Sequence, residues 1–349
     1  MAGAALTLLR PAGAVYGGLM RARAALYRAG WLPVARVAVP VICVGNLTTG
    51  GTGKSPMVEH VVRILATAGV KAGIASRGYR RRTRAADVVT VSDGDGRIAS
   101  PDTGGDEPVM LARALPQVPV VVCANRHAAA ARLVNEFQCA AVVLDDGFQH
   151  LALHRDLDIV LIDASANLAA EPLLPAGHRR EPLAALARAG AIIHTRADGA
   201  FLGANRATAC RYAPAAAQFT ARFVGDGFVS ATGERLPMNS LAGRKVLAFC
   251  GLARPKPFFE ALRQAGCEVV AHACPDHEPY PPSLLGQLAA KAREAACFAA
   301  VTTAKDAVKL PADGFSPGLP LFVLVQRVEM DDDSAFRRFV LGVARRGPA

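Results

Sequence analysis

The feature that most restricts the fold is a glycine-rich turn directly after an apolar segment. Residues 41–56 read VICVGNLTTGGTGKSP. The apolar residues predict a buried strand, and Pro56 suits the first turn of a helix, where a missing N–H costs nothing. Between them, glycines let successive backbone N–H groups curl around phosphate oxygens, and the helix N-terminus adds a positive dipole. The segment therefore predicts a strand, a phosphate-binding loop and a helix.

Side chains of this loop match those that hold a nucleoside triphosphate. Lys54 would reach the β- and γ-phosphates, and the Ser55 hydroxyl would ligate Mg²⁺. Thr48 departs from the strict pattern G-x-x-x-x-G-K-[ST], which has glycine there. An ordinary glycine-rich turn is the alternative, but strand, loop, Lys-Ser and helix occur together, which favours nucleotide binding. The predicted nucleotide-binding residues are Thr49, Gly50, Gly51, Thr52, Gly53, Lys54 and Ser55.

A pair of carboxylates follows another apolar segment, in residues 140–150, AAVVLDDGFQH. A phosphate-binding loop of this type needs a carboxylate on a neighbouring strand to hold Mg²⁺ directly or through water. The carboxyl ends of parallel strands are where such folds bind ligands. Asp-Asp-Gly alone is more often a turn, but a buried strand before it favours the metal. We therefore expect Asp145 and Asp146 to join Ser55 as metal ligands.

Strands alternate with helices through the first half, which predicts an α/β fold of the P-loop NTPase type, with a mostly parallel sheet flanked by helices. Continuous Val, Ile and Leu runs suit strands buried on both faces. The expected strands are Val37–Val44, Lys71–Ala75, Val88–Val91, Val118–Ala124, Ala140–Leu144 and Asp158–Ile162. The expected helices are Pro56–Ala68, Glu107–Ala114 and Arg126–Phe137.

A second, smaller α/β domain is expected after a proline-rich loop at Glu171–Pro182. Its expected elements are Ala191–Thr195, Lys245–Cys250, Phe258–Ala265, Glu268–His272, Leu284–Ala296, Ala299–Thr303 and Leu321–Val325. The predicted domains are residues 1–30, an N-terminal helix at the membrane; residues 31–165, the nucleotide-binding domain; and residues 166–349, a second domain closing over the site.

The N-terminal segment is rich in Ala, Leu and Gly, with four arginines from Arg10 to Arg28. Pro11 and these charges interrupt any run long enough to span a bilayer, and Arg10 follows the first apolar stretch, unlike the charge of a signal peptide. A helix in the membrane interface, with arginines reaching anionic headgroups, is one interpretation. A plain helix docked on the first domain is the other, and both stay open. The net charge of +11 implies an anionic partner or, equally, a solvated basic surface.

Nine short motifs in sequence order identify a family. They are residues 45–56, Ser76–Tyr79, Gly105–Pro108, Asn125–Arg126, Asp145–His150, Leu174–Gly177, Arg180–Pro182, Asp276–His277 and Thr303–Ala307. Together they resemble the tetraacyldisaccharide 4'-kinases over nearly the whole chain. The resemblance implies transfer of the γ-phosphate of ATP to the 4'-hydroxyl of a tetraacylated glucosamine disaccharide 1-phosphate, with ATP and Mg²⁺ as cofactors. It also implies a peripheral, monotopic protein on the cytoplasmic face of the bacterial inner membrane.

The resemblance carries roles to individual residues. Asp106 matches the proposed general base, which would accept the proton of the sugar hydroxyl, and His277 matches the histidine proposed to pair with it. From the residues alone, Asp106 could instead cap the helix that begins at Glu107, and His277 could be an ordinary loop histidine. Ala304 and Glu278 depart from the usual family residues, which leaves the geometry of the C-terminal motifs open.

Three arginines match family positions near the phosphates or the acceptor, where a guanidinium fork suits phosphate oxygens. These are Arg77, Arg126 and Arg180, of which the last two are assigned to catalysis with Lys54. Asn46, Gln149 and Arg77 are the expected substrate-binding residues. Arg80, Arg81, Arg82 and Arg84 extend the basic cluster toward substrate or membrane, or form a solvated loop.

Two other classes of protein were weighed. A P-loop GTPase or ATPase switch acting through protein partners is the main alternative, but the chain lacks the Asn-Lys-x-Asp that recognises guanine; Thr303–Asp306 is the nearest match. A nucleic-acid-binding protein is disfavoured by the absence of known motifs and by a low aromatic content of 6%. The expected partners are therefore the acylated disaccharide phosphate and the anionic inner-membrane surface, with no nucleic acid and no obligate protein partner.

Overall fold

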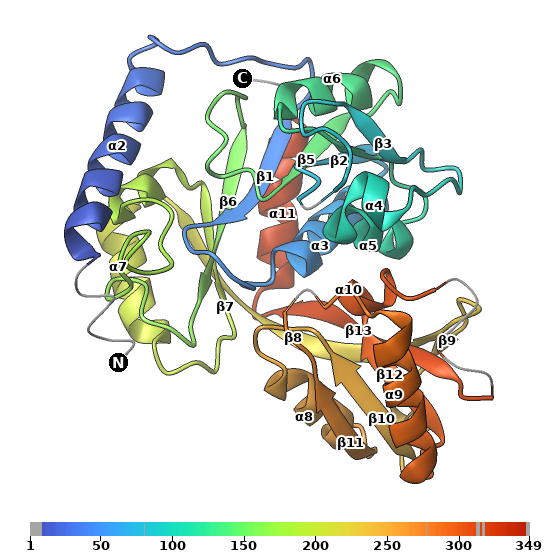
Figure 1. Cartoon of the computed structure of the whole chain (residues 1–349). Helices are drawn as coiled ribbons and strands as arrows, with labels where there is room; N and C mark the ends of the chain where they lie inside the picture. Colours follow the sequence, from blue (N-terminus) through green and yellow to red (C-terminus); the bar gives the residue numbers. More distant parts are fainter. Residues whose placement is uncertain (1–8, 80, 277, 312–314, 316–317, 347–349) are drawn as a thin grey trace. The chain divides into compact units, whose positions relative to one another are not determined.

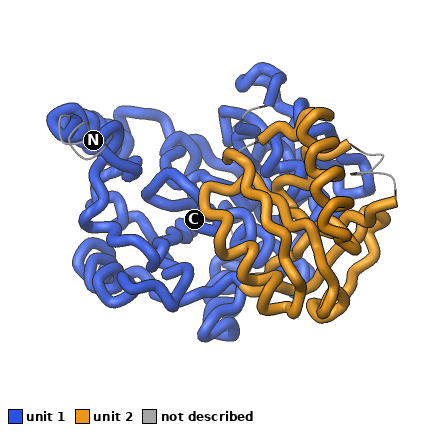
Figure 2. Tube along the Cα trace, turned by 60° about the horizontal axis from the view of Figure 1, so that its bottom comes forward, with its two compact units in different colours: residues 1–223, 328–349 blue, residues 224–327 orange. Residues whose placement is uncertain are grey.

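The computed structural model describes residues 9–79, 81–276, 278–311, 315 and 318–346. The chain forms two compact units, Met1–Phe223 with Val328–Ala349, and Val224–Arg327 (Figure 2). It passes from the first unit to the second within strand β8 (Ala217–Ser230) and returns within strand β13 (Leu321–Met330).

The first unit is built on a parallel sheet in the order β8-β7-β6-β1-β5-β2-β4-β3 (Figure 1). Among the described strand pairs within this order, β3 runs antiparallel to its neighbour β4 and the others are parallel. Every residue of β1, β2, β4 and β5 is buried, as expected of continuous apolar runs between two layers of helices. The strand bounds are β1 Val41–Asn46, β2 Ala72–Ser76, β3 Val89–Ser92, β4 Val120–Val122, β5 Ala141–Asp145, β6 Leu157–Asp163 and β7 Ala191–Thr195.

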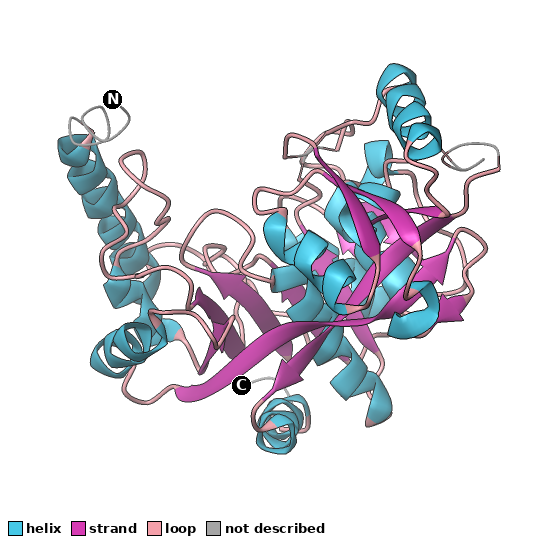
Figure 3. Cartoon of the chain, turned by 90° about the horizontal axis from the view of Figure 1, so that it is seen from below, coloured by secondary structure: helices cyan, strands magenta, loops and turns pink. Residues whose placement is uncertain are grey.

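Helices flank this sheet (Figures 1 and 3). Their bounds are α2 Arg10–Arg28, α3 Lys54–Thr67, α4 Pro101–Gly104, α5 Asp106–Ala114, α6 Arg126–Asn135, the 3₁₀ helix η1 Leu183–Arg188, α7 Leu202–Tyr212 and α11 Asp333–Ala344. Helix α3 packs on β1, β2 and β5, with α11 against it, and α6 packs on β2, β4 and β5. Asn125 begins α6, because its side chain accepts hydrogen bonds from the N–H groups of His127 and Ala128.

The second unit holds parallel strands in the order β11-β10-β12-β13, which belong, in the described part of the chain, to the same 13-stranded sheet as the strands of the first unit. One hydrophobic cluster includes Phe258 and Leu262 of α8, and another includes Leu285 and Leu288 of α9. The remaining bounds are β9 Arg235–Leu236, η2 Met238–Leu241, β10 Lys245–Cys250, α8 Lys256–Gln264, β11 Glu268–Ala273, α9 Pro282–Glu294, β12 Ala299–Thr303 and α10 Ala304–Ala307.

The predicted elements are confirmed, three of them (β7, β10 and β12) to the residue. The division of the chain differs from the expected one, because the boundary expected after residue 165 lies inside the first unit. The reason is strand pairing: β7 pairs with β6, and β8 pairs with β7, so the sheet of the first unit continues past residue 165. The long strand β8 and the helices α7 and α11 are not among the predicted elements.

Helix α2 is docked on one face and exposed on another. Gly13 and Gly17 are its buried residues, and a Cβ on Gly17 would lie 2.7 Å from Cδ1 of Leu173. Val15 is 66% exposed and Leu19 is 61% exposed. In the part of the chain that the structure describes, no helix combines the length and the apolar character needed to cross a bilayer. The helix therefore has both a docking face and a free apolar stripe.

Candidate active site

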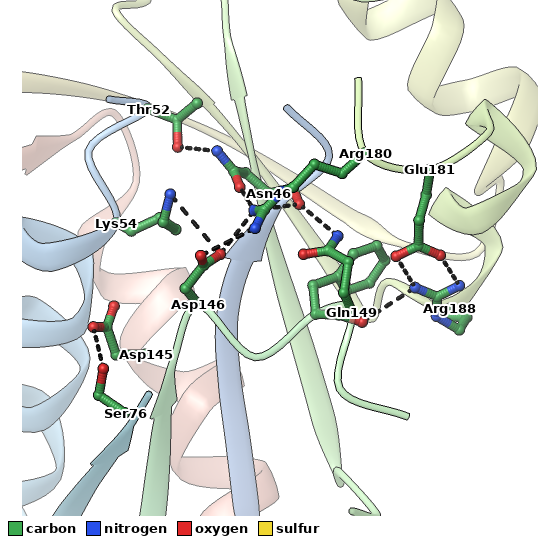
Figure 4. Close-up of polar contacts among 11 residues, drawn as sticks. Asn46, Thr52, Lys54, Ser76, Asp145, Asp146, Gln149, Arg180, Glu181 and Arg188 are labelled. Atoms are coloured by element: carbon green, nitrogen blue, oxygen red, sulfur yellow. Dashed lines mark hydrogen bonds and ion pairs between the residues drawn. The ribbon is translucent and has the colours of Figure 1, made fainter. Parts of the chain in front are cut away.

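Four parallel strands of the first unit end at one edge of the sheet. There β1 ends at Asn46, β2 at Ser76, β5 at Asp145 and β6 at Asp163. The loop between β1 and α3 lies at the same edge, because it begins where β1 ends. Parallel topology thus gathers side chains that are far apart in the sequence, as the close-up in Figure 4 shows.

The glycine-rich loop has a tight backbone and one open side. Gly50 has φ +102° and Gly53 has φ +89°, conformations that suit glycine. A Cβ on Gly50 or Gly51 would meet no described atom within 4 Å, whereas one on Gly53 would lie 1.9 Å from the Phe223 ring. The loop is thus closely backed at Gly53 and open around Gly50–Gly51, where backbone N–H groups could meet a ligand.

Two segments of the first unit hold the tip of this loop. The N–H of Thr49 donates to the carbonyl of His178 at 2.7 Å. Arg196, which follows β7 and pairs with Asp163, donates through Nη2 to the carbonyl of Gly51 at 3.0 Å. These bonds fix the outer edge of the loop without using its open side.

A polar network joins the loop to Asp146, the second member of the aspartate pair (Figure 4). Lys54, the first residue of α3, places Nζ 3.9 Å from Oδ1 of Asp146. Arg180 donates to both carboxylate oxygens of Asp146, at 3.0 and 2.7 Å, and to the side-chain oxygen of Asn46. Asn46 in turn donates to Oγ1 of Thr52 at 2.8 Å. The network thus brings together predicted nucleotide, metal and substrate residues.

Asp145 is a buried carboxylate with spare hydrogen-bonding capacity. Ser76 donates to its Oδ2 at 3.1 Å, but its Oδ1 accepts no hydrogen bond from any described residue. Burial raises the pKa of Asp145 to about 7, and the negative charges of Glu107 and Asp146 contribute. A buried oxygen with no partner beside other carboxylates fits a hard cation such as Mg²⁺, which binds one or two carboxylates plus phosphate oxygens.

The pKa of Asp146 shifts in the opposite direction to that of Asp145. Burial alone would raise its pKa, but the hydrogen bonds from Arg180 and the charge of Lys54 outweigh it and lower the pKa below its usual value. Its backbone has φ +51°, which turns the chain sharply after β5. Burial, and then the nearby charge of Arg77, lowers the pKa of Arg126, while both aspartates oppose this shift. Arg77 and Arg126 therefore share the electrostatic environment of the aspartate pair.

The remaining predicted residues lie as follows. Ser55 is in the first turn of α3, and Gln149 donates to the carbonyl of Asn46 at 3.0 Å. Asp106 is the first residue of α5, and its N-cap is Gly105, so the capping role weighed for Asp106 falls to glycine. A Cβ on Gly105 would lie 2.9 Å from the carbonyl oxygen of Tyr79, which places Asp106 beside the loop after β2. His277 lies outside the described residues.

The basic cluster after Arg77 has mostly structural contacts. Arg81 donates to the carbonyls of Val122, Arg84, Ala85 and Asp87, so its guanidinium ties its own loop together. Arg82 forms an exposed ion pair with Asp102. Arg80 lies outside the described residues.

Sequence reasoning missed several residues that shape the site. Ser76 and Glu107 belong to quoted motifs but carried no assigned role, although both act on Asp145. Arg188 had no sequence signal, because it matters only through partners brought near by the fold. Arg196 likewise acts on a distant segment, the carbonyl of Gly51. A search for polar residues directly after each predicted strand would have found Ser76 and Arg196.

A buried strand, an open glycine loop, a lysine-bearing helix and an aspartate pair on the adjacent strand together define a P-loop nucleotide-binding protein of the α/β class. Comparison with known proteins narrows this class. The chain matches the family model LpxK, tetraacyldisaccharide-1-P 4'-kinase, over residues 5–345, and it belongs to this family of kinases. The family match does not favour the alternative of a P-loop switch.

Relatives agree with this assignment along most of their length. The tetraacyldisaccharide 4'-kinase of Geobacter metallireducens is 41% identical over 308 residues, which cover 87% of this chain and 88% of the relative. That of Anaeromyxobacter sp. (strain Fw109-5) is 44% identical over 314 residues, covering 86% and 83%. The crystal structure of LpxK from Aquifex aeolicus in complex with ATP superposes with a TM-score of 0.80 at 28% identity, covering 97% of this chain and 99% of that one.

Proposed function

We propose that this chain transfers the γ-phosphate of ATP to the 4'-hydroxyl of a tetraacylated glucosamine disaccharide 1-phosphate, forming lipid IVA in lipid A biosynthesis. The family match over residues 5–345 supports this reaction. The observation that carries it to this chain is the meeting of Lys54, Asp146 and Arg180 beside an open glycine loop. The solved relative from Aquifex aeolicus binds ATP, which supports ATP as the donor here.

In this proposal the nucleotide lies along residues 49–55. Backbone N–H groups and Lys54 hold the β- and γ-phosphates, and Ser55, Asp145 and Asp146 hold Mg²⁺. A metal held by these residues would supply positive charge that offsets the negative charge developing during transfer. Arg126 and Arg180 add positive charge at the same place. The ion pair with Asp146, at 3.9 Å, keeps the Lys54 ammonium beside the proposed phosphate site.

The acceptor is proposed to bind beside the same edge, with Arg77, Asn46 and Gln149 as its polar contacts. Asp106 accepts the proton of the attacking hydroxyl, since a hydroxyl needs a positioned base during phosphoryl transfer. The assignment of His277 as the partner of this base comes from the family pattern alone.

Membrane association at the cytoplasmic face of the inner membrane is proposed for α2. The helix shows an exposed apolar stripe that includes Val15 and Leu19, and Trp31 just beyond it is 79% exposed. Arginines on the same helix can reach anionic headgroups. The net charge of +11 acts in the same direction. A peripheral position suits an enzyme whose acceptor carries four acyl chains.

The test is ATP turnover with and without a micellar acylated disaccharide phosphate. We expect phosphorylated acceptor in step with ADP, and an Asp106→Asn enzyme with kcat lower by about 10² or more but similar ATP affinity. Asp102→Asn, an exposed aspartate on α4, is the matched control and should keep full activity. ATP hydrolysis that ignores the acceptor would support a switch and reject the kinase.

A further inference from the structure

Two loops carry the charged pair at the centre of the site. Asp146 lies in the turn after β5, and Arg180 lies in the segment before η1. The two hydrogen bonds from the Arg180 guanidinium to the Asp146 carboxylate join residues 34 positions apart in the sequence. Their side chains are also partly exposed, 35% for Asp146 and 19% for Arg180. A partly exposed ion pair between loops adds little restraint of its own. Backbone hydrogen bonds restrain both residues, from the N–H of Arg180 to the carbonyl of Leu47 at 2.7 Å and from that of Asp146 to the carbonyl of Val44 at 3.0 Å, and side-chain contacts can add to them.

Arg188, the last residue of η1, contacts one residue close in sequence to Arg180 and one close in sequence to Asp146. Its Nη1 and Nη2 donate to the two carboxylate oxygens of Glu181, each at 3.0 Å. The same Nη2 donates to the carbonyl of Phe148 at 3.2 Å, and the guanidinium lies 4.2 Å from the centre of the Phe148 ring. Glu181, which directly follows Arg180, faces Arg188 in Figure 4. Phe148 is two residues after Asp146 in the sequence.

The residues that Arg188 holds are themselves rigidly placed. The Glu181 side chain is 4% exposed, and Phe148 is fully buried. A Cβ on Gly45 would lie 2.6 Å from the Cβ of Phe148, so the backbone and Cβ of Phe148 pack directly against β1. Loss of Arg188 would leave a buried carboxylate without its cation beside Arg180. Arg188 thus ties the Arg180 segment to a fixed point of the sheet.

We propose that Arg188 is a positioning residue for phosphoryl transfer, which holds Arg180 in register with Asp146 through Glu181 and Phe148. The inference rests on the proposed kinase function. It assigns Arg188 an effect on the reaction that passes through Arg180, because the Arg188 guanidinium is already occupied by Glu181 and Phe148. A purely structural ion pair would stabilise the protein without this dependence on Arg180.

The first measurement compares Arg188→Met and Arg188→Lys with the wild type in the acceptor phosphorylation assay. We expect kcat to fall about 10- to 100-fold in Arg188→Met, since misplacement by about 1 Å can cost this much, with a small change in KM for ATP. Arg188→Lys should recover part of the loss, because lysine keeps the charge but not the fork. Arg132→Met is the matched control: Arg132 pairs with Glu136 and donates to the carbonyl of Val88, away from the aspartates.

The deciding measurement is a double-mutant cycle on kcat with Arg180→Met. If Arg188 acts through Arg180, Arg188→Met should cost little in the Arg180→Met background. Equal losses in both backgrounds, or unchanged kcat in Arg188→Met, would overturn the inference while leaving the kinase intact. A wild type that phosphorylates no acceptor would overturn the proposed function and this inference together. If Arg188→Met does not fold, as judged by thermal unfolding, Arg188→Lys enters the same cycle with the same criterion.

Discussion

Asp145 and Asp146 are adjacent and chemically identical, yet the fold shifts their pKa values in opposite directions. Burial and the charges of Glu107 and Asp146 raise the pKa of Asp145, whereas Arg180 and Lys54 lower that of Asp146. The sequence predicted both as metal ligands but could not separate their roles, because the difference comes from surroundings rather than from side-chain type. Arg180 approaches only one of them.

The raised pKa of Asp145 makes stability depend on pH. The folded-state pKa is about 7 and the ordinary value is 3.8, so the cost of burying this carboxylate is absent below about pH 4 and complete above about pH 7. Asp145→Asn should therefore raise the free energy of unfolding of the ligand-free protein by about 2 to 4 kcal/mol at pH 8, and by much less at pH 4.5. Urea unfolding in EDTA at both values measures this. An equal difference at the two values would contradict it.

At the scale of elements, the junction between the glycine loop and α3 leaves little room for any residue but glycine. Gly53 combines φ +89° with close contact to Phe223. Gly53→Ala should destabilise the protein by about 2 to 4 kcal/mol, since strain and overpacking add, and should weaken ATP binding. Gly69→Ala at the other end of α3 is the control, because Gly69 has φ +76° but open space around it. Calorimetric titration with ATP measures the affinity of both variants. Equal affinities would contradict a role of Gly53 in ATP binding.

Helix α2 should bind membranes through its exposed stripe. Val15→Ser combined with Leu19→Ser should lower binding to vesicles containing anionic phospholipid about tenfold or more, since each buried apolar side chain contributes about 1.5 to 3 kcal/mol. Phe298→Ser, which changes an exposed aromatic of the second unit, is the control. Vesicle co-sedimentation at fixed salt is the measurement. A similar loss in both proteins would mean that the stripe has no special role.

Element prediction succeeded where the pattern is local. Strands such as β7 and β12 read as unbroken apolar runs because both faces are buried. Strand β8 was missed because its residues alternate irregularly between buried and exposed, and it continues from one unit into the other. Helix α11 was missed although Asp332 caps it, accepting from the N–H of Ala335, which is a readable signal.

At the scale of the whole molecule, the two units have separate hydrophobic clusters. Binding of ATP with Mg²⁺ at residues 49–55 should therefore protect the first unit preferentially. At 100 times Kd the expected stabilisation is about 2.7 kcal/mol. Hydrogen exchange should slow in β1, β5 and α3 and stay unchanged in the edge strand β11. If exchange in β11 slows as much as in β1, the prediction that ATP protects the first unit preferentially is wrong.

The division into units shows the limit of reading a chain in order. The expected boundary followed the proline-rich loop, but strand pairing keeps residues up to Phe223 in the first unit and returns Val328–Ala349 to it. Which strands pair depends on the folded sheet rather than on nearness in the sequence. Composition along the chain therefore does not mark this boundary.

The sequence by itself determined the strand–loop–helix that we propose meets phosphate, the aspartate pair, the alternation of strands and helices, and the family, because each depends on contiguous residues and local periodicity. The tertiary structure alone decided that Arg180 pairs with Asp146, that Oδ1 of Asp145 has no hydrogen-bond partner among the described residues, and that Arg188 and Arg196 bond to Glu181 and Gly51. The physical reason is that charge pairing and burial depend on distances in the folded chain, which the carboxyl ends of parallel strands bring together from separate motifs.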